Sequence, residues 1–355
     1  MKILFIYYYP SGGVETLARQ RSIALKNYGI SFDFLYYWKG PGLQNIEGNR
    51  IFITNQDTEI QTIIENEKYD AIIVCSDHIT IAKIRKFGYN GVLIYEIQGL
   101  GNLEEADYWF KGSVVNVTGS VNAILLPKTP HLTMLTQTYF PNLNYYSFHN
   151  CIDTKRFIYK SLPKLDYPVI GWVGRLEENK NWKGFLDIGS ELFKVDPTIH
   201  LWMFMDYSIA TVEEKTAFQK RVLELQLNKH LHVLDNVPHE KMPDYYSLIG
   251  DSGGLLLSTS KIEGFGYAVV EAMSCMCPVL SSDSDGIKSS IIHDKTGKIY
   301  SFNNIQAAVS EAKELLFNHS LRESIKQNAL KHVHQHFSPA IYAKNFLEML
   351  KSLGL

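Results

Sequence analysis

The chain has 355 residues, of which 45% are hydrophobic and 20% charged, a composition typical of folded globular proteins and not of disordered or collagen-like chains. Its formal net charge of -2 excludes the strongly basic field that binds DNA or RNA generically, so no nucleic-acid partner is expected. The length exceeds one ordinary hydrophobic core and predicts two domains of similar size.

The first half alternates between β-rich runs and helical patterns. A buried strand is predicted at residues 2–9, followed by a Pro-Ser-Gly-Gly loop and a helix over 14–29 that ends at a glycine. Strands apolar on both faces belong in parallel sheets covered by helices, so this half is predicted to be doubly wound. The other predicted strands are 31–38, 70–75, 91–97, 113–119 and 145–150.

The same alternation restarts at Tyr167 and continues to the helical tail after Phe302. The segment Lys155–Asp166 is rich in lysine, proline and turn formers and is predicted to be the linker. Predicted strands are 168–175, 199–205, 231–235, 253–260, 278–282 and 297–302, and predicted helices are 181–197, 212–227, 241–250 and one beginning near Phe265.

We therefore expect an α/β protein with two Rossmann-like doubly wound domains that face each other across a cleft. The first domain spans residues 1–160 and the second 161–337, with a C-terminal helix near 338–355 packing back on the first. In this architecture, ligands bind at the carboxyl ends of the strands, where helix N-termini point inward.

The N-terminal apolar run reaches Pro10 and two glycines too soon for a signal peptide, and no run approaches the about 18 apolar residues of a membrane span. Cytoplasmic location is expected, since the cysteines are sparse and lie mostly in apolar segments. Peripheral contact with the inner membrane face would require a basic surface, and Lys83, Arg85 and Lys86 make only a weak patch. The cysteines are Cys75, Cys151, Cys275 and Cys277.

Two glutamates flank a Gly-Phe-Gly turn in KIEGFGYAVVEAM. The helix after the turn presents unpaired amides suited to a phosphate, with Glu263 before it and Glu271 more than one turn inside it. Carboxylates accept hydrogen bonds from hydroxyls, which fits a nucleotide sugar with a hexose on one side of its diphosphate and a ribose on the other. The alternative is that Glu263 caps the helix and Glu271 pairs on its surface.

Two cations follow a predicted strand that ends at Gly174. Arg175 offers a bidentate fork and Lys180 a mobile charge, a combination suited to a departing diphosphate. The alternative is that both are surface cations paired with Glu177 and Glu178.

With these residues in place, the sequence resembles the retaining GT-B glycosyltransferases of glycosyltransferase family 4, the glycosyl transferases group 1. The E-x7-E element is the most specific part of the likeness, which covers nearly the whole chain. The matching segments are SGGVETLARQRSIAL, FHNCIDTKRF, VGRLEENKNWKG, VPHEKMPDYYS, EGFGYAVVEAM and CPVLSSDSDGI.

The resemblance implies transfer of a hexose from a nucleotide diphosphate sugar, with UDP favoured, to a glycan, lipid-linked or small-molecule acceptor with retention of anomeric configuration. It assigns catalytic roles to Arg175, Lys180 and Glu263, with Glu263 on the donor sugar and Glu271 on the ribose. No cofactor and no metal are expected. The donor-binding residues it implies are Gly12, Gly13, Gln98, Gly174, Val237, Gly264, Phe265, Gly266, Tyr267, Ala268 and Glu271.

The sequence departs from the family pattern at several positions. Gln98 stands where relatives commonly have a histidine near the donor sugar, and Cys151 replaces the glycine of an Asn-Gly-x-Asp motif. Asp283 and Asp285 form an Asp-x-Asp sequence, which we interpret as loop residues and not as a metal site. Two alternatives therefore stay open: a catalytically weak sugar-binding component of an assembly, and a nucleotide-sugar epimerase on the same fold.

The acceptor is expected to bind the first half, which is rich in aromatic residues. Most of these rings are expected to be core or strand residues. They are Tyr7, Tyr8, Tyr9, Tyr36, Tyr37, Trp38, Tyr108 and Trp109.

Overall fold

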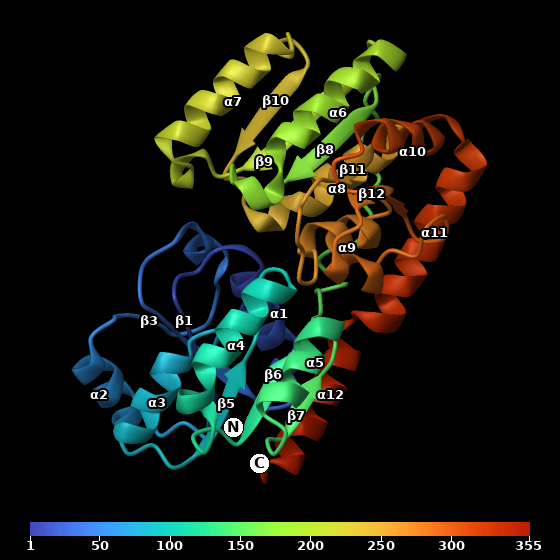
Figure 1. The fold of residues 1–355 in the computed structure, drawn as a ribbon. Coiled ribbons are helices and arrows are strands. Elements are labelled where there is room, and N and C mark those ends of the chain that lie inside the picture. Colours follow the sequence, from blue (N-terminus) through green and yellow to red (C-terminus); the bar gives the residue numbers. More distant parts are fainter. The chain divides into compact units, whose positions relative to one another are not determined.

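The computed structural model describes residues 1–355, apart from the side chain of Asp285. The chain divides into two compact units (Figure 1). Unit 1 comprises Met1–Asp153 and Phe337–Leu355, and unit 2 comprises Thr154–His336. The sequence predicted boundaries at 160 and 337. The segment Lys155–Asp166, predicted to be a linker, lies within unit 2, where the carbonyl of Phe157 accepts a hydrogen bond from Ser274.

Unit 1 contains a seven-stranded parallel sheet in the order β3-β2-β1-β4-β5-β6-β7. The C-terminal helix α12 packs on α1. The elements of unit 1 are β1 Lys2–Tyr7, α1 Gly12–Lys26, β2 Ser31–Tyr36, η1 Pro41–Asn45, β3 Ile51–Ile53, α2 Asp57–Glu67, β4 Ala71–Cys75, α3 His78–Lys86, β5 Val92–Glu96, α4 Leu103–Val117, β6 Ala123–Leu126, α5 Pro130–Tyr139, β7 Tyr145–Ser147 and α12 Pro339–Ser352.

Unit 2 contains a six-stranded parallel sheet in the order β10-β9-β8-β11-β12-β13. Its elements are β8 Val169–Val173, η2 Glu178–Lys180, α6 Trp182–Val195, β9 His200–Met205, η3 Tyr207–Ile209, α7 Val212–Glu224, β10 Leu231–Asp235, η4 His239–Lys241, α8 Met242–Asp251, β11 Leu255–Ser258, α9 Tyr267–Ser274, β12 Val279–Ser282, η5 Asp285–Ser289, β13 Lys298–Tyr300, α10 Ile305–Phe317 and α11 His319–His336.

Successive residues of a strand point to opposite faces of the sheet, so a strand that is buried throughout has a covered sheet on both sides. In β1, Leu4 and Ile6 join the core cluster that includes residues of α2 to α5, and all the residues Ile3–Ile6 are fully buried. On the other face, Phe32 of β2 contacts Phe346 of α12 at a ring separation of 6.3 Å. The predicted class of two doubly wound α/β domains is confirmed.

Each sheet reverses its strand order once, between β1 and β4 in unit 1 and between β8 and β11 in unit 2. At such a switch point, the loops that follow the two central strands diverge and leave room for a ligand at their carboxyl ends. The residues that follow β8 and β11, and those that follow β1 and β4, are therefore the first places to look for a site.

One expectation about an individual element is wrong. Residues 113–119 were predicted to be a strand, but Ser113–Val117 form the last part of α4. Tertiary packing overrides the β propensity of the three valines here, because Val117 is fully buried against the helical layer of unit 1. The helix predicted to begin near Phe265 begins at Tyr267, after Gly266 as its N-cap residue.

Three histidines lie together in unit 2: His200 in β9, His232 in β10, and His230 just before β10. Nδ1 of His200 and Nε2 of His232 are 2.9 Å apart, and the ring of His230 lies 5.3 Å from that of His200. The pKa of His200 is below its ordinary value because burial disfavours the cation, and His232 and His230 lower it further. The folded protein therefore favours a neutral imidazole at this position.

The free energy of unfolding is expected to fall as the pH drops below about 6.5, the ordinary pKa of histidine. The unfolded chain binds a proton at His200 more readily than the folded one, so this stabilisation is present above that pH and is lost below it. Urea unfolding between pH 5 and 7.5, compared with a His200→Phe variant, checks this. The difference between the two proteins should vary with pH, whereas parallel curves would contradict the assignment.

Among the helices of the described residues, none combines the length and the hydropathy that a membrane crossing needs.

Candidate functional site

The loops that follow β8 and β11 are joined directly at the switch point of unit 2. The side-chain amide of Asn179 donates to the backbone carbonyl of Ile262 and accepts from its amide, both at 3.1 Å. The backbone carbonyl of Asn179 accepts from the amide of Lys261 at 2.8 Å. Oγ1 of the fully buried Thr259 donates to the carbonyl of Lys180 at 2.9 Å. These bonds fix two segments about 80 residues apart in sequence as one surface.

This surface brings together two of the predicted site residues. Nζ of Lys180 lies 2.5 Å from Oε1 of Glu263, and Oγ of Ser260 donates to the same oxygen at 2.7 Å. The alternative for Lys180 was a surface pairing with Glu178, and the alternative for Glu263 was a capping role at the start of α9. The structure supports neither. Glu178 is bonded to Lys261 instead, and the N-cap position belongs to Gly266.

Arg175 lies on the same loop as Lys180 but with a different partner. Its side chain is 40% exposed and Nη2 donates to Oε1 of Glu177 at 3.1 Å. The surface pairing with Glu177 is therefore present. Gly174 precedes it, and a Cβ at this position would lie 2.7 Å from the ring of Trp172 and 3.3 Å from Cβ of Lys180, so the close packing of the loop requires glycine.

The turn before α9 comprises Gly264–Gly266, and Tyr267 and Ala268 open the helix. Gly266 adopts the left-handed conformation with φ of +73°, which glycine tolerates best. Gly286 approaches from η5: its amide donates to the carbonyl of Glu263 at 3.0 Å, and a Cβ there would lie 2.2 Å from that oxygen. Phe265 is buried beneath the turn. The amides that open α9 belong to a turn fixed from both sides.

Glu271 lies inside unit 2 and not on its surface. It is 3% exposed, its Oε1 lies 2.8 Å from Nε2 of His239, and its Oε2 accepts from the hydroxyl of Tyr246 at 3.1 Å. Burial and the adjacent Glu271 carboxylate raise the pKa of Tyr246 well above its ordinary value, so its hydroxyl remains a donor. The alternative of a surface pairing of Glu271 is therefore wrong. Val237 lies in the loop between β10 and η4.

Three predicted donor-binding residues lie in unit 1. Gly12 and Gly13 are exposed at the start of α1, directly after β1. Gln98 follows β5, with its Nε2 donating to Oε1 of Glu96 at 3.0 Å and its Oε1 accepting from Asn150 at 3.2 Å. The amide of Gln98 is thus held by an internal network.

Other predicted features have structural partners. Asp283 accepts from the amide of Phe302 at 2.9 Å, and the side chain of Asp285 lies outside the described residues. Arg85, one of the three cations of the basic patch, donates to the carbonyls of Ser120, Tyr89 and Gly91. The four cysteines are free and buried.

Within the described residues, one group of side chains has the spacing of a metal site: His293, Asp294 and Glu311. The ammonium of Lys298 lies 2.6 Å from carboxylate oxygens of both Asp294 and Glu311. A cation of the chain itself therefore already neutralises these acids.

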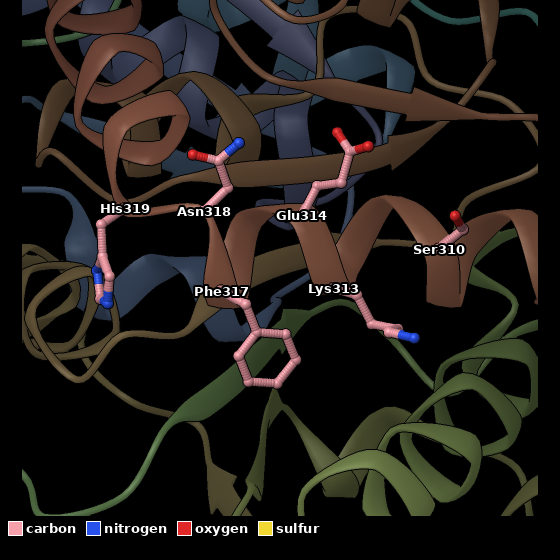
Figure 2. A pocket seen from close by; sticks show the side chains of 6 residues that line it. All are labelled: Ser310, Lys313, Glu314, Phe317, Asn318 and His319. Atoms are coloured by element: carbon pink, nitrogen blue, oxygen red, sulfur yellow. The ribbon is translucent and has the colours of Figure 1, made fainter.

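A surface hollow lies along the last turns of α10 (Figure 2). Lys313 and Phe317 point to one side of the helix, whereas Glu314 and Asn318 point to the other, so these groups do not converge on a common ligand. Glu314 is also bonded to Lys298. None of the predicted site residues lines this hollow.

Sequence reasoning missed the residues that hold the predicted ones in place. Ser260 on Glu263, and His239 and Tyr246 on Glu271, have no motif of their own within the segments that contain them. Only the order of the strands brings η4 and α8 against α9. A search for polar residues at the carboxyl ends of β10 and β11 would have included Ser260 and His239.

Solved structures with the same overall fold are glycosyltransferase-type enzymes of the GT-B fold. Sucrose-phosphate synthase from Thermosynechococcus elongatus superimposes with a TM-score of 0.83 at 16% identity, over 99% of this chain and 98% of that one. The Anabaena protein HepE, crystallised with UDP and glucose, gives a TM-score of 0.83 at 16% identity, over 99% of this chain and 100% of that one. The fold is therefore GT-B.

Residues 153–332, half of the chain, match the family of glycosyl transferases group 1, and the protein belongs to this family of transferase enzymes. Among curated relatives, trehalose synthase from Thermococcus litoralis is 25% identical over 221 residues, which cover 60% of this chain and 52% of that enzyme. The chain spans about half the length of the first curated relatives that it matches.

Proposed function

We propose that the protein transfers a hexose from a nucleotide diphosphate sugar, with UDP as the favoured nucleotide, to a glycan, lipid-linked or small-molecule acceptor. The proposal rests on one observation: Lys180 and Glu263 meet at the switch point of unit 2, beside the turn that opens α9. A cation, a carboxylate and helix amides in one place suit a diphosphate and the hydroxyls of a sugar. The bound UDP and glucose of HepE support the choice of nucleotide.

The reaction is proposed to retain the anomeric configuration, as the resemblance to glycosyltransferase family 4 implies, and to proceed by front-face transfer. The bond from the anomeric carbon to the diphosphate breaks while the bond to the acceptor oxygen forms, and the acceptor proton passes to the departing phosphate oxygen. Lys180 and Arg175 would stabilise the charge that develops on the diphosphate. Glu263 has one carboxylate oxygen on Lys180 and Ser260, and its other oxygen would accept from a sugar hydroxyl.

A panel of UDP-, GDP-, ADP- and TDP-sugars tests the proposal. A ligand at 100 times its Kd adds about 2.7 kcal/mol to the stability of the folded protein, so the true nucleotide should raise Tm clearly. Slow hydrolysis of the same donor, followed by NMR of the released sugar, shows turnover and its stereochemistry. Absence of stabilisation by every nucleotide would overturn the proposal.

A catalytically weak, sugar-binding role is the second candidate. The observation that favours it is Gln98, whose amide is engaged by Glu96 and Asn150 and which cannot carry the charge of a histidine. Nucleotide binding without donor hydrolysis or transfer, with every acceptor offered, would favour this role over the first.

Metal independence is a further expectation, because Lys180 and Arg175 supply the positive charge that a divalent ion would otherwise provide. Donor hydrolysis should be unchanged after treatment with EDTA and gel filtration. Loss of activity that Mg²⁺ or Mn²⁺ restores would contradict it and would draw attention to Asp283.

We also propose that the reaction takes place in the cytoplasm, where free thiols such as the four buried cysteines persist.

Tyr246→Phe is expected to weaken nucleotide binding by about tenfold, because a hydrogen bond to a charged group contributes about 1.5–3 kcal/mol. In this proposal Glu271 accepts the ribose hydroxyls, and Tyr246 and His239 hold its carboxylate in place. Calorimetric titration with UDP measures the effect. Tyr159→Phe is the matched control, since its hydroxyl donates at 2.8 Å to Asp251 on the surface. Equal affinities for the two variants would show that Glu271 needs no such support.

A further inference from the structure

Five aromatic rings lie at or just after the ends of β1 and β2 in unit 1, each next to another in a row. Ring centroids are 6.4 Å apart for Tyr9 and Tyr7, 5.5 Å for Tyr7 and Tyr8, 5.7 Å for Tyr8 and Tyr37, and 5.8 Å for Tyr37 and Trp38. We call this group the aromatic shelf. It begins at Tyr7, the last residue of β1, and so lies at the carboxyl ends of these strands.

The inner rings of the shelf are fixed by hydrogen bonds. The hydroxyl of Tyr37 lies 2.7 Å from Oδ2 of Asp77, and that of Tyr8 donates to the carbonyl of Ser76 at 3.1 Å. Ser76 and Asp77 follow β4, so these bonds span the switch point between β1 and β4. The shelf is thus built across the place where a doubly wound sheet binds its ligand.

The backbone beneath the outer rings is also close-packed. The amide of Trp38 donates to the carbonyl of Tyr8 at 3.0 Å. Gly40 and Gly42 lie against Pro10, and a Cβ at these positions would come within 2.6 and 2.8 Å of its carbonyl oxygen. The two loops that hold Tyr9 and Trp38 therefore form one rigid unit.

The two outer rings are the most exposed of the shelf. Trp38 is 53% and Tyr9 is 38% exposed, whereas Tyr7, Tyr8 and Tyr37 are partly buried. Large aromatic side chains left in solvent on a rigid base indicate a binding surface.

The charges of this region do not favour an anion. Arg19 is paired with Glu15 and Arg21 with Glu96, all four being buried, and the carboxylate of Asp77 already bonds Tyr37 and the amides that open α3. Lys39 is exposed beside Trp38. A neutral ring with apolar faces and hydroxyl edges suits this surface better than a phosphate, because aromatic faces pack on apolar surface and tyrosine hydroxyls bond polar groups.

We propose that the aromatic shelf binds a pyranose ring of a carbohydrate acceptor, with Trp38 and Tyr9 packing against the ring. This inference rests on the proposed function and deepens it, because it selects a saccharide acceptor from the three acceptor classes. Neither Trp38 nor Tyr9 is among the residues proposed to bind the nucleotide sugar.

Tryptophan fluorescence of the full chain tests the shelf directly. Of the five tryptophans, Trp38 is more than half exposed, whereas Trp172, Trp182 and Trp202 are buried. Titration with methyl glycosides and disaccharides of glucose, galactose, mannose and N-acetylglucosamine should give a saturable change for at least one sugar. Tyr9→Ala should weaken that binding by about tenfold, and Trp38→Phe should retain binding in a thermal-shift assay that Trp38→Ala loses.

The controls separate this inference from the proposed function. Tyr108→Ala removes an aromatic ring that is 81% exposed on α4, away from β1 and β2, and should leave saccharide binding unchanged. Thermal stabilisation by UDP and hydrolysis of the donor should also be the same in Tyr108→Ala as in the unaltered protein. Failure of nucleotide binding in the unaltered protein would sink the proposed function but not the shelf.

Two results would overturn the shelf. One is the absence of binding to every saccharide, or binding that Trp38→Ala and Tyr9→Ala do not alter. The other is a fluorescence change with phosphatidylglycerol vesicles and not with sugars, which would mark the exposed rings as a lipid contact.

Discussion

Replacing Lys180 with alanine is expected to lower kcat about 10²–10³-fold, the usual cost of removing one group that stabilises developing charge. The donor Kd should change much less, because the ammonium interacts most strongly with the diphosphate as its charge grows in the transition state. Lys180 is suited to this role because the bond from Thr259 to its carbonyl fixes its backbone, while its side chain ends at Glu263. Single-turnover rates and equilibrium titration with the donor separate the two quantities.

Lys261→Ala is the matched control, since Lys261 lies in the adjoining loop and pairs with the exposed Glu178. Its kcat should stay within about twofold of the unaltered enzyme, because exposed ion pairs contribute about 0–1 kcal/mol. Glu263→Gln tests whether the effect of Lys180 arises only from releasing its partner. The double variant combines Lys180→Ala with Glu263→Gln. If it recovers the rate lost in Lys180→Ala, or if Lys180→Ala changes the donor Kd and not kcat, the assigned role is wrong.

Periodicity predicted most of the fold, because strands buried on both faces are nearly continuous apolar runs and the covering helices repeat every three to four residues. Local pattern failed where two signals conflicted. Residues 113–117 contain three β-branched residues, yet they continue a helix that begins with a capping box between Asn102 and Glu105. This capping box, which marks the start of the helix, lies eleven residues before Ser113, outside the segment from which the strand was predicted.

The candidate site was predictable in its loops and not in its pairings. Arg175, Lys180 and Glu263 follow strands whose carboxyl ends meet at a switch point, so their shared location follows from strand order. The bond between Lys180 and Glu263 joins residues 83 positions apart, and that between His239 and Glu271 joins residues 32 apart. Such contacts depend on side-chain rotamers and loop geometry, which no local pattern specifies.

Gln98 shows the same limit in unit 1. The sequence shows that Gln98 stands where relatives commonly have a histidine. It does not show that Glu96 and Asn150 hydrogen-bond the Gln98 side chain and so fix its orientation. Glu96 is itself bonded to Arg21, so Gln98 lies at the edge of a buried ionic network.

Arg21→Met is expected to lower the free energy of unfolding of unit 1 by about 3–5 kcal/mol, because it leaves the Glu96 carboxylate buried without its cation. Both side chains are fully buried, and the guanidinium bonds the carboxylate at 2.9 and 2.5 Å while its Nε donates to Tyr342 of α12 at 2.7 Å. Burial alone would lower the pKa of Arg21, but the charge of Glu96 raises it above its ordinary value. The guanidinium of Arg21 therefore stays charged throughout the accessible pH range.

Denaturant unfolding measures the loss, with separate probes for the two units because they can unfold in separate transitions. Arg50→Met is the matched control: its guanidinium also lies 2.5 Å from a carboxylate, that of Glu67, but its side chain is 56% exposed, so its removal should cost less than about 1 kcal/mol. A double variant, Arg21→Met with Glu96→Leu, should recover most of the lost stability, because a buried apolar pair carries no desolvation penalty. If Arg21→Met lowers the stability no more than Arg50→Met does, the bonds of Arg21 to Glu96 and Tyr342 do not stabilise the packing of α12 on α1. If the single loss is large and the double variant does not recover it, the bond to Tyr342 and the packing around it contribute more than the charge pair.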